Sequence, residues 1–168
     1  MRTLVALAFA FVAFVALGAG LARPSLGPVP LGLVVMCVVL ERDVVGGALT
    51  SALVGYVADV LWASERGLHA LAAAATFLML RVLVARVPGS RPPTVIGLGT
   101  LGVASVALLP SLADAVLGGG TRSPLAALAA APGLAFVGAL LAWPTFVVFR
   151  RVERGFRERE EDAALRRL

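Results

Sequence analysis

Several polar residue types are missing from this chain of 168 residues, and each absence narrows the possible chemistry. The sequence contains no lysine, asparagine or glutamine, and it has a single cysteine, a single histidine and a single tyrosine. One cysteine cannot form an internal disulfide, and one histidine cannot supply a multi-histidine metal site. No nucleophile with a neighbouring base, phosphate-binding loop or pair of catalytic carboxylates can be assembled. We therefore expect no catalytic residue, no metal site and no cofactor.

Charge is also absent over long stretches of the sequence. Residues 3–22 and 125–149 are uncharged, 60% of all residues are hydrophobic, and the mean hydropathy is +0.95. Soluble domains are about 45–50% apolar, and roughly 20 mainly apolar residues suffice to cross the hydrocarbon core of a bilayer. The composition therefore excludes a soluble globular domain and a disordered chain, and it predicts a polytopic membrane protein.

The apolar residues fall into six segments, which predicts an all-α membrane helix bundle over residues 1–149. The segments are residues 3–22, 28–40, 44–62, 67–85, 94–117 and 125–149. The second segment is the weakest, because 13 helical residues rise only about 20 Å. Residues 150–168 are predicted to form a basic cytoplasmic helical tail.

The arginines predict the orientation of these segments. With six spans and both termini in the cytoplasm, twelve of the 15 arginines lie inside and three outside, as the positive-inside tendency requires. If residues 3–22 were instead a cleaved signal peptide, five spans would remain, but this apolar run is longer than usual for a signal.

Arg81 is expected to extend its guanidinium group to the lipid headgroups. The basic flank of the last span comprises Arg150, Arg151, Arg154 and Arg157. Its position beside a membrane span argues against nucleic-acid binding.

One face of the third segment carries small residues at intervals of four, with an acid at each end. This ridge consists of Asp43, Gly47, Ser51, Gly55 and Asp59. Small residues at this spacing allow a second helix to approach closely in a membrane. That helix could belong to a partner protein or to the same chain, and the pattern alone leaves both open.

Asp59 is the most informative single residue, because an ionisable group inside a span is costly unless it is paired or hydrated. Arg66, His69 or a nearby helix end could pair with it. The alternative is a carboxylate at the membrane interface that contacts water.

Prolines mark further features of the predicted helices. Pro132 and Pro144 lie inside the last segment and are candidate kinks. Residues 88–93 are proline-rich and are expected to be a non-helical connector. Ser123 followed by Pro124 is typical of an N-cap and the first helical position.

The sequence resembles the MreD family of rod shape-determining membrane proteins of bacteria. The residues that carry the resemblance are Gly47-(x7)-Gly55-Tyr56-(x2)-Asp59-(x7)-Gly67-Leu68-His69-Ala70-Leu71. The size, the proline cluster before a short second segment and the late proline before a basic end are also similar. The chain departs from the family at the start of the second segment, in the loop before Gly67, and in lacking an asparagine in the last span.

The resemblance implies a non-enzymatic scaffold of the cell-elongation machinery in the bacterial inner membrane, which acts in peptidoglycan synthesis. Its implied partners are the lipid bilayer, an MreC-like protein and, through that protein, MreB, RodA and the elongation transpeptidase. Gly47, Ser51, Gly55, Asp59, Gly67 and His69 are then candidate helix-packing or partner-contact residues. The alternative is a small-molecule-binding subunit of a vitamin or solute importer. That function needs several convergent polar groups, of which this chain has few, so we expect no small-molecule substrate.

Overall fold

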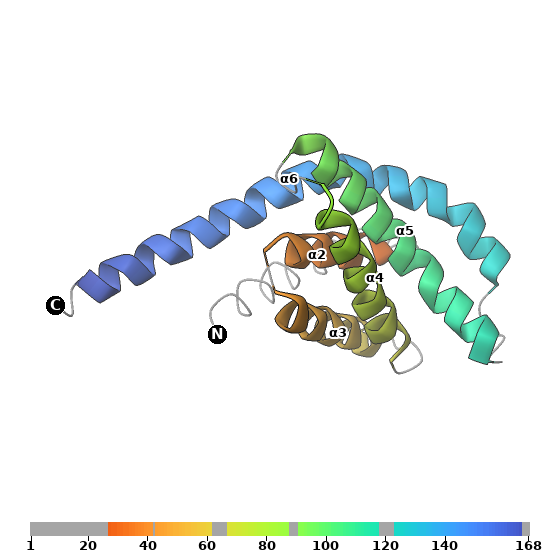
Figure 1. The fold of residues 1–168 in the computed structure, drawn as a ribbon. Helices are drawn as coiled ribbons and strands as arrows, with labels where there is room; N and C mark the ends of the chain where they lie inside the picture. Colours follow the sequence, from red (N-terminus) through yellow and green to blue (C-terminus); the bar gives the residue numbers. More distant parts are fainter. Residues whose placement is uncertain (1–26, 42, 62–66, 88–90, 118–122, 166–168) are drawn as a thin grey trace.

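The structure is a computed structural model that describes residues 27–41, 43–61, 67–87, 91–117 and 123–165 (Figure 1). The described residues form five α-helices and no β-strand, which confirms the predicted all-helical fold. The helices are α2 (Pro28–Glu41), α3 (Val44–Leu61), α4 (Leu68–Val84), α5 (Pro92–Leu117) and α6 (Pro124–Leu165). The first predicted segment, residues 3–22, lies outside the described residues.

The short helix α2 forms the centre of the bundle. It packs against α3, α4, α5 and α6, and its side chains from Leu33 to Val39 are all buried. A helix that is apolar all round is expected to be buried. Its closest neighbour is α5: a Cβ atom added at Gly32 would lie 2.5 Å from the Cα atom of Val103. The segment that is weakest as a membrane span is therefore the core helix of this fold.

Three of the helices are long and apolar enough to cross a membrane. They are Val44–Leu61, Pro92–Val116 and Pro124–Val152. The two other apolar helices, Pro28–Leu40 and Leu68–Val84, are shorter. At 1.5 Å per residue they rise only about 20–26 Å, whereas the hydrocarbon core is about 30 Å thick. The described residues thus have the build of a membrane protein, but they do not support six full spans or a particular orientation of the termini.

The predicted last span and the predicted tail are one continuous helix, α6, of 42 residues. Figure 1 shows it as an arch whose C-terminal part extends beyond the other helices. Pro132 and Pro144 lie inside α6 without interrupting it, and both are exposed. A proline ring clashes with the carbonyl group four residues earlier, which opens the helix on the proline side. Two prolines on the exposed side therefore favour curvature toward the bundle.

The starts of three helices follow from their first residues. The Asp43 carboxylate accepts a hydrogen bond of 2.9 Å from the Gly46 N–H group and caps α3. The Ser123 hydroxyl accepts one of 3.4 Å from Ala126, with Pro124 as the first helical residue, so the predicted cap of α6 is confirmed. Helix α5 begins at Pro92, inside the predicted connector. That prediction was wrong by two residues, because the first N–H groups of a helix have no intrahelical acceptor and prolines are tolerated there.

Helices α5 and α6 pack as antiparallel neighbours through small residues. A Cβ atom added at Gly99 would collide with the Cβ atom of Ala142, and one added at Gly138 would lie 2.8 Å from the Val103 Cγ2 atom. These two contacts define the register of the pair, in which residue numbers on α5 rise as those on α6 fall. The start of α5 therefore lies level with the part of α6 around residue 150.

Candidate functional site: the α3–α4 hairpin

The signature residues from Gly55 to Leu71 lie where α3 ends and α4 begins, whereas Gly47 lies in the first turn of α3. Asp59 lies in the last turn of α3 and is only 2% exposed. Its Oδ2 atom accepts hydrogen bonds of 3.1 Å from the N–H groups of Gly67 and Ala70. Its Oδ1 atom accepts a bond of 3.1 Å from the His69 N–H group and lies 2.8 Å from the Nδ1 atom of His69. Each carboxylate oxygen thus has two partners.

These bonds make Asp59 the cap of α4, although it belongs to the preceding helix. The first N–H groups of a helix lack intrahelical acceptors, and a negative charge there is stabilised by the helix dipole. Gly67 precedes the first turn with a φ of 95°, a left-handed conformation that glycine adopts without strain, and it offers no side chain for the cap. The N–H group of Leu71 then makes the first intrahelical bond, to the Gly67 carbonyl oxygen. An acid is unfavourable at the end of its own helix, and the start of α4 compensates for this.

Of the pairing groups left open for Asp59, His69 and the start of α4 are the ones observed. His69 is only 7% exposed, so the pair is enclosed by the protein. The alternative of a hydrated carboxylate at the interface is wrong, because the hairpin covers Asp59 almost completely. Arg66 lies outside the described residues.

Gly55, one turn before Asp59, allows the two helices to approach. A Cβ atom at this position would lie 2.7 Å from the Cα atom of Ala70 and would collide with the carbonyl oxygen of His69. Gly47 and Ser51 are also buried, and the Ser51 hydroxyl has no hydrogen-bond partner among the described residues. Gly47, Ser51, Gly55 and Asp59 of the ridge are therefore covered within this chain, whereas Asp43 at its start is exposed. This burial favours packing within the chain over a partner-binding groove, and the partner contact stays a prediction.

The basic flank of α6 is less enclosed. The Arg150 guanidinium group lies 5.4 Å from the centre of the Phe146 ring, within range of a cation–π contact. Arg151 and Arg154 are exposed, and the side chain of Arg157 lies outside the described residues. These arginines are far along the chain from the hairpin.

The surroundings of two polar residues, one half-buried and one buried, were not predicted from the sequence. Arg81 does not simply reach toward headgroups: its Nη1 atom donates a 2.9 Å hydrogen bond to the carbonyl oxygen of Val39, one of the last carbonyl groups of α2. Asp114, in the last turn of α5, is 1% exposed. The sequence does not indicate that Arg81 pairs with Val39, which lies 42 positions earlier, because this contact depends on how α2 and α4 cross.

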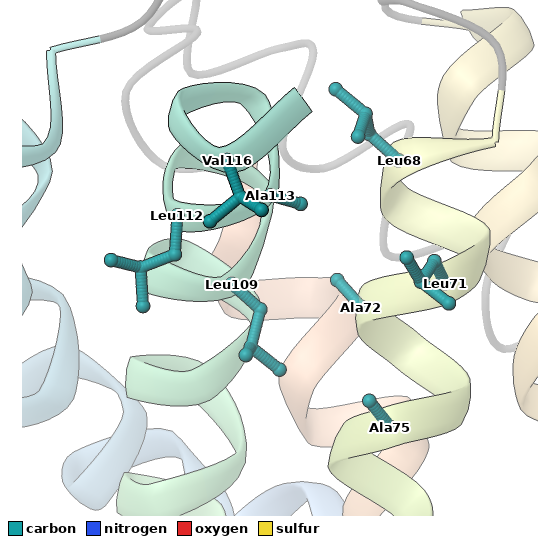
Figure 2. A pocket seen from close by; sticks show the side chains of 8 residues that line it. All are labelled: Leu68, Leu71, Ala72, Ala75, Leu109, Leu112, Ala113 and Val116. Atoms are coloured by element: carbon teal, nitrogen blue, oxygen red, sulfur yellow. The ribbon is translucent and has the colours of Figure 1, made fainter. Parts of the chain in front are cut away.

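An apolar groove of about 430 Å³ lies between α4 and α5 (Figure 2). In Figure 2 Leu109 of α5 and Leu68 and Ala72 of α4 point toward the space between the two helices. The lining residues are Leu68, Leu71, Ala72 and Ala75 of α4, and Leu109, Leu112, Ala113 and Val116 of α5. A solute site normally combines apolar walls with a few polar groups that orient the ligand. The lining of this groove provides no polar side chain for that purpose.

The chemistry of the hairpin is therefore that of a structural joint. The Asp59 carboxylate already accepts four hydrogen bonds, so a substrate or metal would have to displace them. Within the described residues, no group of three or more histidine, cysteine, aspartate or glutamate side chains could hold a metal ion. Comparisons of the chain with protein-family models, with curated proteins and with solved structures find no match.

Proposed function

We propose that this chain is a non-enzymatic scaffold of the MreD type in the bacterial cell-elongation machinery. The observation that carries the proposal is that three signature residues act together to place the start of α4 against the end of α3. Gly55 allows α4 to approach, Asp59 caps it, and Gly67 provides the left-handed residue before its first turn. The spacing that produces the resemblance is thus also the spacing that this joint requires.

The distribution of polar groups supports a scaffold over an enzyme. The buried carboxylate of Asp59 and the ring of His69 are used to hold α3 against α4. Much of the remaining surface is apolar, and Val45, Leu53 and Val60 of α3 are each more than half exposed. Such surfaces suit contact with lipid or with other membrane helices.

In this proposal the chain is a multi-pass protein of the inner membrane with both termini in the cytoplasm. An MreC-like protein is its direct partner and links it to MreB, RodA and the elongation transpeptidase. Because the ridge of α3 is buried from Gly47 to Asp59, partner contacts belong on the exposed faces, such as that of Leu49, Leu53 and Tyr56.

The test combines depletion with cross-linking in the native bacterium. Depletion should convert rods to rounded cells, and the tagged chain should be cross-linked to an MreC-like protein. A photo-reactive residue at Leu53 should capture that partner, whereas one at Val54, which is buried on the same helix, should not. Normal rods after depletion, together with no elongation protein among the captured partners, would refute the proposal.

The groove between α4 and α5 does not favour the importer alternative, because its lining lacks polar side chains to orient a solute. Thermal unfolding with a panel of vitamins separates the two functions. A scaffold should show no shift in melting temperature, whereas a substrate-binding subunit should be stabilised by its ligand.

A further inference from the structure

Arginines from three segments of the chain converge at one end of the bundle. Here α4 ends, α5 begins, and α6 leaves the other helices (Figure 1). The contacts of Gly99 with Ala142 and of Gly138 with Val103 align α5 and α6, and the same antiparallel register places Arg91 level with Arg150. We call this region the arginine end, and it comprises Arg81, Arg86, Arg91, Arg150, Arg151 and Arg154.

Five of these side chains are exposed, and four of the five lack an acidic partner in the described part of the chain. Arg86, Arg91, Arg151 and Arg154 are exposed, and none forms an ion pair with an acidic side chain in the described part of the chain. The two others are anchored to the bundle: Arg81 donates to the last turn of α2, and Arg150 lies against an aromatic ring.

Among the described side chains, the acid near this end is Asp43, which follows α2 and whose carboxylate caps the first turn of α3. The side chains of Glu41 and Glu153 lie outside the described residues. The described side chains therefore leave an excess of positive charge at the boundary between apolar helices and their surroundings.

We propose that the arginine end binds the phosphate groups of anionic lipids at the membrane surface. Guanidinium groups form charge-assisted, often bidentate hydrogen bonds with phosphate oxygens. Next to these arginines lie the apolar parts of α5 and α6, which are long enough to cross a membrane. The arginines therefore lie at the depth of the lipid headgroups, whose phosphates are the anions found there. Each basic residue close to an anionic leaflet strengthens binding by about five-fold. The inference does not depend on the proposed cell-elongation function.

The full-length protein in detergent would be titrated separately with phosphatidylglycerol and phosphatidylcholine, and the bound lipids counted by native mass spectrometry. The wild type should prefer phosphatidylglycerol. Replacing Arg86, Arg91, Arg151 and Arg154 together by glutamine should lower that preference at least ten-fold, while the melting temperature stays unchanged. Raising the ionic strength to about 1 M, where the Debye length is near 3 Å, should weaken the wild-type preference similarly.

Two control variants make the test specific. The fourfold arginine-to-lysine variant keeps the charge and should retain most of the preference. Arg122→Gln removes one charge from the connection between α5 and α6, and it should leave the preference unchanged, whereas Arg91→Gln should lower it several-fold. The inference is overturned if the fourfold glutamine variant prefers phosphatidylglycerol as strongly as the wild type. It is equally overturned if Arg122→Gln has the same effect as Arg91→Gln. If this surface instead bound an acidic protein, the fourfold glutamine variant would bind lipid as the wild type does, and the inference would be overturned.

Discussion

Replacing Asp59 by asparagine should destabilise the protein strongly, although the two side chains have nearly the same shape. The carboxylate presents two oxygens, and each accepts two hydrogen bonds from the start of α4. An asparagine has one acceptor oxygen and one NH₂ group, which only donates. With its NH₂ group toward His69, the amide can donate to the Nδ1 atom once the imidazole takes its other tautomer, but the buried His69 N–H group loses its acceptor and faces another donor. In the opposite orientation, the N–H groups of Gly67 and Ala70 both lose their acceptor.

The size of the effect follows from these orphaned donors, one in the better orientation of the amide and two in the other. A buried donor without a partner costs about 1–3 kcal/mol, and the better orientation loses one such donor. Loss of the negative charge beside the helix N-terminus adds up to about 1–2 kcal/mol. For a chain of this size, 1 kcal/mol corresponds to a shift of about 2–4 °C in the melting temperature, so a decrease of order 10 °C is expected.

Asp43→Asn provides the matched control. It makes the same chemical change at another helix-capping aspartate, but Asp43 is exposed, and its carboxylate caps α3 through the bond from Gly46. Aspartate and asparagine are about equally good N-caps, so the expected change is within about 0.5 kcal/mol. Thermal unfolding in detergent, followed by circular dichroism, measures both variants. Amide exchange should also speed up in Asp59→Asn at residues 67, 69 and 70 specifically.

Equal melting temperatures for Asp59→Asn and Asp43→Asn would refute this reasoning. So would a loss of stability in Asp59→Asn without faster amide exchange at the start of α4. Equal melting temperatures would mean that the buried carboxylate does not stabilise α4 as its cap. Lost stability without faster exchange would mean that the carboxylate stabilises a part of the protein other than the start of α4.

Further predictions concern helix packing, the end of α2 and the tail. Gly55→Ala should cost roughly 1–3 kcal/mol in unfolding experiments, because its Cβ atom would meet the backbone of α4. Gly133→Ala, at an open position of α6, should instead be neutral or stabilising by up to about 1 kcal/mol. Arg81→Gln should lower the free energy of unfolding by about 1–3 kcal/mol, because it weakens the bond to the Val39 carbonyl group. Deleting residues 158–168 should leave membrane insertion and melting temperature unchanged, because α6 extends beyond the other helices there; degradation of the truncated protein would contradict this.

Helix positions were largely predictable from the sequence, because apolar runs and their end signals are local. The predicted segment 44–62 corresponds to α3, and the predicted segment 67–85 corresponds to α4, each to within one residue at either end. Ser123 and Pro124 predicted the start of α6 correctly, because a serine hydroxyl can cap a helix and proline is favoured at the first helical position. The predicted helical tail is helical to Leu165 and continues the last segment without a break, since charge begins at Arg150 inside α6. A change in polarity shows where a helix leaves an apolar environment, and it does not show where the helix ends.

The environment of each helix was less predictable, because it depends on which segments meet. The length of α2 made it a weak membrane span, but its uniform apolarity is equally the property of a core helix. Its close contact with α5 at Gly32 depends on a crossing that sequence periodicity does not encode. The pairing of Arg81 with the end of α2 has the same origin.

Asp59 shows how much of a site can follow from local sequence. An acid in the last turn of a helix is unfavourable for that helix, so its presence indicates a compensating positive group nearby. His69 and the start of the next helix were both candidates, because a loop of a few residues keeps them close. The carboxylate can bond to the His69 ring and to the start of α4 at the same time only because the two helix axes lie close together. Gly55 makes this close approach possible. The signature is therefore best understood as one joint: the glycine allows the approach, the acid caps the second helix, and the left-handed glycine lets that helix begin within reach.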